Sequence, residues 1–187
     1  DNKKGKLIRV LEPSPMESAS PCPHAGVCGG CTYQTLDFDQ EADYKKNLLE
    51  KLYQEAGLLE GDLKFTRSPV ESGYRNKMEY SFGDEEKGGP LALGLHRKAR
   101  FYELVNTDHC NIVPEDFNTI RMAVRDYFDQ LGTPFYHLMR RTGILRYLVL
   151  RYAQATGEIL INLVTTHEGV DMDAFVDMVL DLKLQGK

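Results

Sequence analysis

The fold is decided by two short runs in the middle of the chain, Lys77-Met-Glu-Tyr-Ser-Phe-Gly83 and Leu91-Ala-Leu-Gly-Leu-His96. Each run is short and carries the apolar residues that are typical of a β-strand. The segment Glu85-Glu-Lys-Gly-Gly-Pro90 lies between them, and its charges, glycines and proline predict a turn. We therefore expect the two runs to pair as a β-hairpin.

The rest of the chain predicts more strands and three helices. The helices follow from apolar residues spaced three and four apart. Asp37 and Gln40 resemble a capping box, Gly57 suits the end of that helix, and Pro114 suits a first helical position. Strands are expected at 63–67, 101–105, 147–154 and 158–165, and helices at 39–56, from Pro114 to Gly132, and at 171–184. This mixed order predicts an α+β fold, an antiparallel sheet with flanking helices.

Composition narrows the possible classes of protein. The chain has 187 residues, 42% of them hydrophobic and 27% charged, as in an ordinary globular protein. It has no apolar run long enough to span a membrane and no signal peptide at its start, so we expect a cytoplasmic protein without a membrane partner. The net charge of −5 does not favour nucleic acid, yet residues 87–151 hold ten Lys or Arg and six Asp or Glu. A local basic surface is compatible with RNA binding.

The four cysteines of the chain are the most specific chemical feature. Cys22, Cys28 and Cys31 form a C-x5-C-x2-C run rich in glycine and proline, and Cys110 follows far along the chain. Three thiolates in a tight loop and one distant thiolate are typical of an iron–sulfur cluster or a structural zinc site. Two disulfides or reduced thiols are the alternatives, which four cysteines in 187 residues favour less.

The spacing of the cysteines favours an iron–sulfur cluster over zinc. Structural zinc sites usually present two paired hooks such as C-x2-C, whereas this chain has one. A cluster is larger than one ion and needs a wider loop, and Gly29 and Gly30 allow the backbone to approach its sulfurs. His24 and His109 lie beside the candidate ligands, and we expect them to be neighbours of the site rather than ligands.

The cysteine run belongs to a longer series of motifs. Cys28-Gly-Gly-Cys-Thr-Tyr-Gln34 is followed by Gly73-Tyr-Arg-Asn-Lys77, Leu93-Gly-Leu-His-Arg97, Asp108-His-Cys110 and Gly143-Ile-Leu-Arg146. From about Lys6 to Lys187 the chain thereby resembles the RNA (uracil-5-)-methyltransferases of the RumA type. The resemblance implies that Cys22, Cys28, Cys31 and Cys110 hold a 4Fe-4S cluster. It also implies an RNA partner, ribosomal RNA rather than transfer RNA.

The resemblance implies a domain order in which this chain is the central part. Residues 1–11, with the strand expected at Lys6–Leu11, would be the last strand of a preceding TRAM domain of the OB type. Residues 12–35 would be a linker and the cysteine loop, and residues 36–60 an amphipathic helix that docks on a methyltransferase domain. Residues 61–187 would be the central α+β RNA-binding domain, cut short at its C-terminal end.

The chain lacks the catalytic parts that the family carries. It has no Gly-rich loop for S-adenosylmethionine, and all four cysteines are assigned to the cluster, so none remains as a nucleophile. The sequence therefore predicts no catalytic and no S-adenosylmethionine-binding residue here. We expect the central region of an S-adenosylmethionine-dependent uridine C5-methyltransferase, which presents RNA to a separate catalytic domain.

The predicted RNA contacts are basic side chains interleaved with aromatic ones. Arg and Lys neutralise phosphates, and aromatic rings stack on exposed bases. The candidates are Arg75, Lys77, Arg97, Lys98, Arg100, Arg140 and Arg141. The alternative is an ordinary solvated sheet face.

Other functions are compatible with the same residues. The first is a zinc-stabilised RNA-binding module with no methyltransferase parent. The second is an electron-transfer protein, although a ferredoxin would be far smaller around its cluster. A protein purified without its metal would be a third case.

Overall fold

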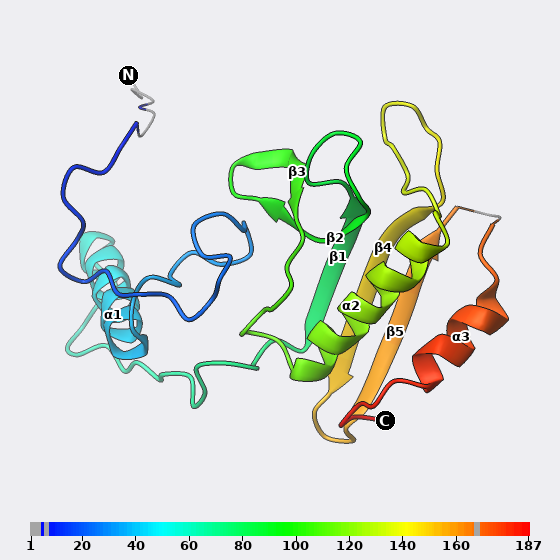
Figure 1. The fold of residues 1–187 in the computed structure, drawn as a ribbon. Helices are drawn as coiled ribbons and strands as arrows, with labels where there is room; N and C mark the ends of the chain where they lie inside the picture. Colours follow the sequence, from blue (N-terminus) through cyan, green and yellow to red (C-terminus); the bar gives the residue numbers. More distant parts are fainter. Residues whose placement is uncertain (1–4, 6–7, 167–168) are drawn as a thin grey trace. The chain divides into compact units, whose positions relative to one another are not determined.

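Five strands form one antiparallel sheet in the order β3-β2-β1-β4-β5 (Figure 1). The structure is a computed structural model that describes residues 5, 8–166 and 169–187. The strands are β1 (Lys77–Gly83), β2 (Ala92–Arg97), β3 (Arg100–Val105), β4 (Leu145–Ala153) and β5 (Glu158–Thr165). Both predicted hairpins are present, and the prediction of an α+β fold with an antiparallel sheet is confirmed.

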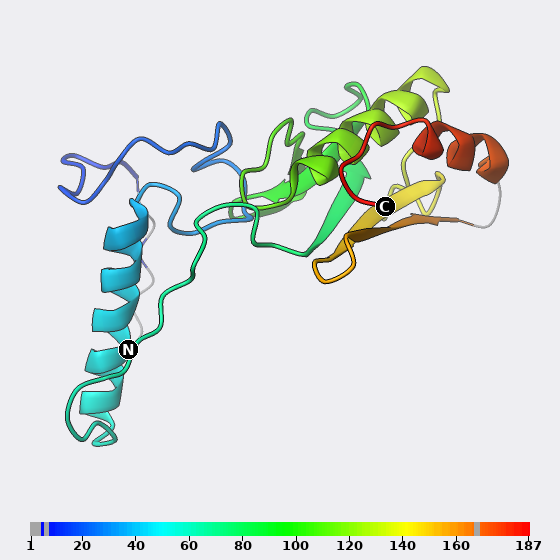
Figure 2. The same ribbon diagram turned by 90° about the horizontal axis from the view of Figure 1, so that it is seen from below.

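Two helices cover one face of this sheet (Figure 2). These are α2 (Glu115–Gln130) and α3 (Met172–Leu180). Phe117, Ile120, Val124 and Phe128 of α2 are buried, as their spacing of three and four predicts. The Phe128 ring stacks on Phe175 at 5.7 Å between centroids. The core therefore lies between this helical layer and the sheet.

The helix boundaries differ from the predictions by one to four residues. Pro114 is the N-cap of α2 rather than its first residue. Helix α3 ends at Leu180 instead of residue 184. The Asp116 carboxylate accepts the backbone N–H groups of Gln185 and Gly186 at 3.0 and 2.8 Å, so these donors are directed away from a helix. A contact from a residue far along the chain thus outweighs the local helical pattern.

The chain divides into two compact units, and the sheet belongs to the second, which comprises residues 21–32 and 68–187. The first unit comprises residues 1–20 and 33–67 and contains α1 (Phe38–Glu55). The Asp37 side chain caps this helix by accepting the Gln40 N–H at 2.8 Å, as predicted. No residue of α1 is buried, and the stripe formed by Leu48, Leu49, Leu52 and Tyr53 is 38–53% exposed.

Two strand predictions in the first unit are not met by the described residues. Residues 63–67 form no strand, so that prediction is wrong. Arg67 instead forms an ion pair with Asp39 and lies over the Phe38 ring at 4.2 Å. Of the strand predicted at 6–11, residues 6 and 7 lie outside the described residues, and residues 8–11 form no strand. In the described part of the chain, no helix is both long and apolar enough to span a membrane.

Candidate functional site

The cysteine loop is attached to the end of strand β2 by backbone hydrogen bonds. The Gly29 N–H donates to the His96 carbonyl at 2.9 Å, and the Lys98 N–H donates to the Val27 carbonyl at 2.8 Å. Together these bonds make an antiparallel bridge between Cys28 and Arg97. The loop therefore belongs structurally to the sheet and is grouped with the second unit, not with the linker before it.

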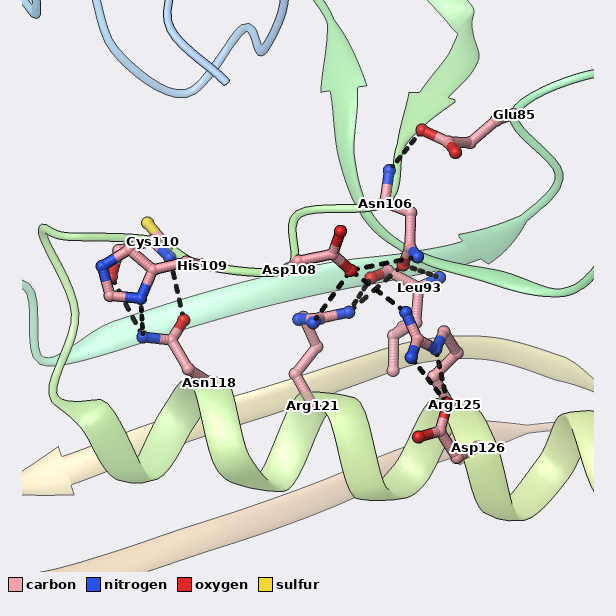
Figure 3. Close-up of polar contacts among 10 residues, drawn as sticks. All are labelled: Glu85, Leu93, Asn106, Asp108, His109, Cys110, Asn118, Arg121, Arg125 and Asp126. Carbon is pink, nitrogen blue, oxygen red and sulfur yellow. Dashed lines mark hydrogen bonds and ion pairs between the residues drawn. The ribbon is translucent and has the colours of Figure 1, made fainter. Parts of the chain in front are cut away.

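The backbone of Cys110 is held by a buried asparagine of α2 (Figure 3). The Asn118 side chain is 1% exposed, and its Oδ1 accepts the Cys110 N–H at 3.0 Å. Its Nδ2 donates to the Cys110 carbonyl at 3.3 Å and to Glu115 at 3.1 Å. One amide thus satisfies both backbone groups of Cys110, which fixes the position of that thiol.

The segment before Cys110 is fixed by two arginines of α2 that point toward Asp108 (Figure 3). Arg121 is 0% exposed, and its Nη1 donates to the Leu93 carbonyl at 3.0 Å and to Asn106 at 3.2 Å. Burial lowers the pKa of this guanidinium, and the nearby Arg125 lowers it further. Arg125 contacts Asp108 at 3.2 Å. We expect Arg121 to be an anchor that ties α2 to β2.

Sequence reasoning missed both Asn118 and Arg121. The position of Arg121 in the helix could have revealed it. Arg121 is four residues after Phe117 and directly follows Ile120, and both of these are buried, so Arg121 lies on the apolar side of α2. A polar residue on the apolar side of a helix has to find partners, and so it often marks a fixed contact.

The thiols of Cys28 and Cys110 are both influenced by neighbouring cysteines. Burial raises the pKa of Cys110, and Cys31, Cys22 and Cys28 each raise it further, against a lowering hydrogen bond from the Ile112 backbone. The pKa of Cys28 is also raised by burial and by Cys31 and Cys22, while the Gly30 N–H, 3.4 Å from its sulfur, lowers it. None of the four cysteines forms a disulfide. The fold thus brings Cys110 toward the three cysteines of the loop.

The part of the chain that the structure describes contains no preformed site for a single metal ion. In the described ranges, no group of three or more His, Cys, Asp or Glu side chains is arranged to hold one metal ion. His109 is half-exposed and lies 3.9 Å from Glu115. The Nε2 atom of His24 is buried and has no hydrogen-bond partner among the described residues.

Five of the predicted RNA contacts lie around one end of the sheet. Arg97 and Arg100 both contact Glu103, at 3.0 and 2.6 Å, and Lys98 is exposed in the turn between β2 and β3. Lys77 begins β1 and contacts Glu79 at 3.1 Å. Arg75 is exposed, and its backbone N–H donates to the Ile112 carbonyl at 2.8 Å. Several of these cations are therefore already paired with glutamates.

One further cation joins this end of the sheet. Lys77 pairs directly opposite Arg151 of β4, and both line a groove of about 480 Å³. Like charges placed opposite each other destabilise a strand pair, so an anion in this groove would relieve the repulsion. The remaining two candidates, Arg140 and Arg141, precede β4 and lie at the other end of the sheet, because Ser81 and not Lys77 pairs with Tyr147 near the start of that strand.

Comparison with known proteins links this chain to RNA methyltransferases. No family model matches. The chain is 48% identical over 164 residues to an uncharacterised RNA methyltransferase of Caldanaerobacter subterraneus, with 87% of the chain and 36% of that protein covered. It is 39% identical over 188 residues to another of Clostridium tetani, which covers the whole chain and 41% of that protein. The chain thus spans about two fifths of the length of these relatives.

A solved structure shares the fold. This is the tRNA (uracil-54, C5)-methyltransferase of Pyrococcus abyssi, solved in complex with S-adenosyl-L-homocysteine. The TM-score is 0.66 at 21% identity, over 89% of this chain and 36% of that one. The α+β arrangement described above therefore occurs within a larger enzyme.

Proposed function

We propose that this chain is the cluster-binding, RNA-presenting region of an S-adenosylmethionine-dependent RNA uridine C5-methyltransferase. The carrying observation is that the fold joins the cysteine loop to the end of β2 and holds Cys110 with Asn118, and the other three cysteines raise the pKa of Cys110. The similarity of the chain to proteins named RNA methyltransferases supports an RNA substrate. The uridine C5 chemistry is supported by the sequence motifs and by the shared fold.

The residues around the thiols fit a 4Fe-4S cluster held by Cys22, Cys28, Cys31 and Cys110. A Cβ on Gly30 would lie 3.0 Å from the Leu95 side chain and 3.4 Å from the Cys28 sulfur, so a side chain there would press on both. The buried Nε2 of His24 is available to donate to a cluster sulfur. When bound, the cluster supplies a cross-link between the loop and the segment that carries Cys110.

Zinc fits these thiols less well. A zinc ion with Zn–S bonds of about 2.3 Å needs its sulfurs roughly 3.8 Å apart. The C-x5-C-x2-C spacing with one distant cysteine suits the larger cluster better. Anaerobic reconstitution with iron and sulfide tests this: we expect four irons and four sulfides per chain and a brown colour that Cys110→Ser abolishes. One tightly held zinc per chain, without iron, would contradict the proposal and support the zinc module.

The RNA surface in this proposal includes the predicted arginines and lysines together with Arg151. Binding of an RNA stem-loop should weaken steeply with salt, because each phosphate contact releases counterions. Arg151→Gln with Lys98→Gln should reduce both the affinity and the slope. Lys183→Gln is the control, since Lys183 is an exposed lysine after α3 and outside the proposed surface. Salt-independent binding, or equal losses in the control, would contradict an RNA role for this end of the sheet. The preference for ribosomal over transfer RNA stays a prediction.

Helix α1 has a proposed partner within the longer protein. Its apolar stripe is exposed to solvent. Exposed apolar patches of this kind usually mark contact surfaces. We propose that it docks on the methyltransferase domain, which would also bring S-adenosylmethionine. Leu49→Glu with Leu52→Glu in the full-length protein should then lower the melting temperature, whereas Lys51→Glu on the same helix should not.

A further inference from the structure

The loop between α2 and β4, residues 133–144, ends in an apolar tip. Leu138 and Met139 are 66% and 85% exposed. Figure 1 shows this loop, in yellow, extending beyond the end of the sheet. Two large apolar side chains at the end of a projection contribute nothing to the core, so a reason for their position lies outside the folding of this unit.

The neck of this loop is closed by backbone hydrogen bonds between its two arms. The Tyr136 N–H donates to the Leu145 carbonyl at 2.7 Å, and the His137 N–H donates to the Thr142 carbonyl at 2.8 Å. At Gly143 (φ +107°), a Cβ would lie 1.9 Å from the Phe135 carbonyl oxygen, so the two arms touch and only glycine fits. The tip is therefore held by two arms of the loop that are fixed to each other.

The tip itself is held in an unusual conformation. The Arg141 N–H donates to the His137 carbonyl at 2.8 Å, and the Arg140 N–H donates to His137 Nδ1 at 3.3 Å. Arg141 adopts a φ of 55°, in the left-handed region that residues with side chains rarely occupy. Strained residues of this kind cluster at binding sites. Leu138 and Met139 directly precede the two arginines in this turn.

The segment that carries the tip has charges of one sign only. Residues 131–157 contain four arginines and no Asp or Glu. Arg146 lies over the Tyr136 ring at 4.8 Å and the Tyr147 ring at 5.6 Å, which places a third cation at the neck. An apolar point flanked by cations matches a nucleic acid, in which apolar wedges separate stacked bases while cations neutralise the adjacent phosphates.

We propose that Leu138 and Met139 form a wedge that enters between stacked bases of a folded RNA, while Arg140 and Arg141 hold the flanking phosphates. This inference rests on the proposed RNA function and adds a mechanical step to it. Separating the stacked bases of a loop makes a uridine accessible to a catalytic domain, because a base inside a stack cannot be reached. The wedge is part of the RNA-presenting role and takes no part in methyl transfer.

The test uses the full-length protein and an RNA hairpin that carries 2-aminopurine beside a loop uridine. Unstacking raises the fluorescence of 2-aminopurine, and anisotropy of a labelled hairpin reports affinity separately. We expect the wild-type protein to raise the fluorescence. Leu138→Ser with Met139→Ser should abolish the rise and weaken binding about tenfold, as the loss of one stacking contact does. Leu131→Ser, which alters a residue 61% exposed at the end of α2, is the matched control.

Substitution of the two arginines is expected to change the salt dependence of binding. Arg140→Gln with Arg141→Gln should lower the slope of log affinity against log salt by about 1.4, which is two phosphate contacts of a single strand. An unchanged fluorescence rise in the Leu138 and Met139 variant, with binding intact, would overturn the wedge and leave the proposed function standing. Absence of RNA binding by the wild-type protein would overturn both. Loss of binding to phosphatidylserine vesicles, with RNA behaviour unchanged, would assign the tip to a membrane and also overturn the wedge.

Discussion

Replacing Asn118 with alanine is expected to destabilise the second unit strongly. The substitution leaves the N–H and the C=O of Cys110 without their partners, at a residue that is 8% exposed. A buried backbone group without a partner costs about 1–3 kcal/mol. The carbonyl has a weaker contact at 3.3 Å, so we expect a total loss of about 2–4 kcal/mol in the free energy of unfolding.

Urea unfolding followed by circular dichroism measures this loss. With a slope of about 2 kcal/mol per molar urea, the midpoint should fall by about 1–2 M. Hydrogen exchange should show faster exchange of the Cys110 amide than of the β1 amides. Asn162→Ala on β5, at an exposed asparagine, should change stability by less than about 0.5 kcal/mol. A loss for Asn118→Ala no larger than that of Asn162→Ala would refute the anchoring role of Asn118.

Three further outcomes follow from the packing and charges of the same unit. Phe128→Ala should cost about 3–5 kcal/mol by thermal or urea unfolding, since Phe128 is 1% exposed between Phe82 and Phe175; a cost below about 1 kcal/mol would contradict this packing. Arg151→Glu should raise stability by about 0.2–1 kcal/mol at low salt, because it turns the like-charge pair with Lys77 into an attractive one; a gain that persists undiminished at high salt would speak against this cause. The reduced, metal-free protein should lose stability as the pH rises above about 9. The folded state raises the pKa of Cys110, so the folded protein keeps this proton at a pH where the unfolded chain releases it. Cys110→Ser should flatten the dependence of stability on pH, and an unchanged curve would contradict this role of Cys110.

Local signals predicted most of the elements. The cap formed by Asp37 and Gln40, the turn at 85–90 and the apolar spacing of α2 depend on residues close together in the sequence, and each has its own short-range cause. The failures have a common origin. Residues 63–67 have a strand-like composition but no partner strand, and α3 ends early because Asp116 captures the backbone of residues 185 and 186. Such outcomes depend on which distant groups come into contact. A local sequence pattern carries no information about those contacts.

The candidate site shows the same division between sequence and tertiary structure. The sequence by itself determined which thiols and which basic residues are available, and it predicted that the four cysteines act together, because ligand chemistry and spacing are properties of the residues. Only the tertiary structure decided that the cysteine loop pairs with the end of β2, that Asn118 fixes Cys110, and that Leu138 and Met139 stand exposed beside two arginines. The physical reason is that these contacts join distant residues, and the free energy of packing the sheet against α2 and α3 selects them.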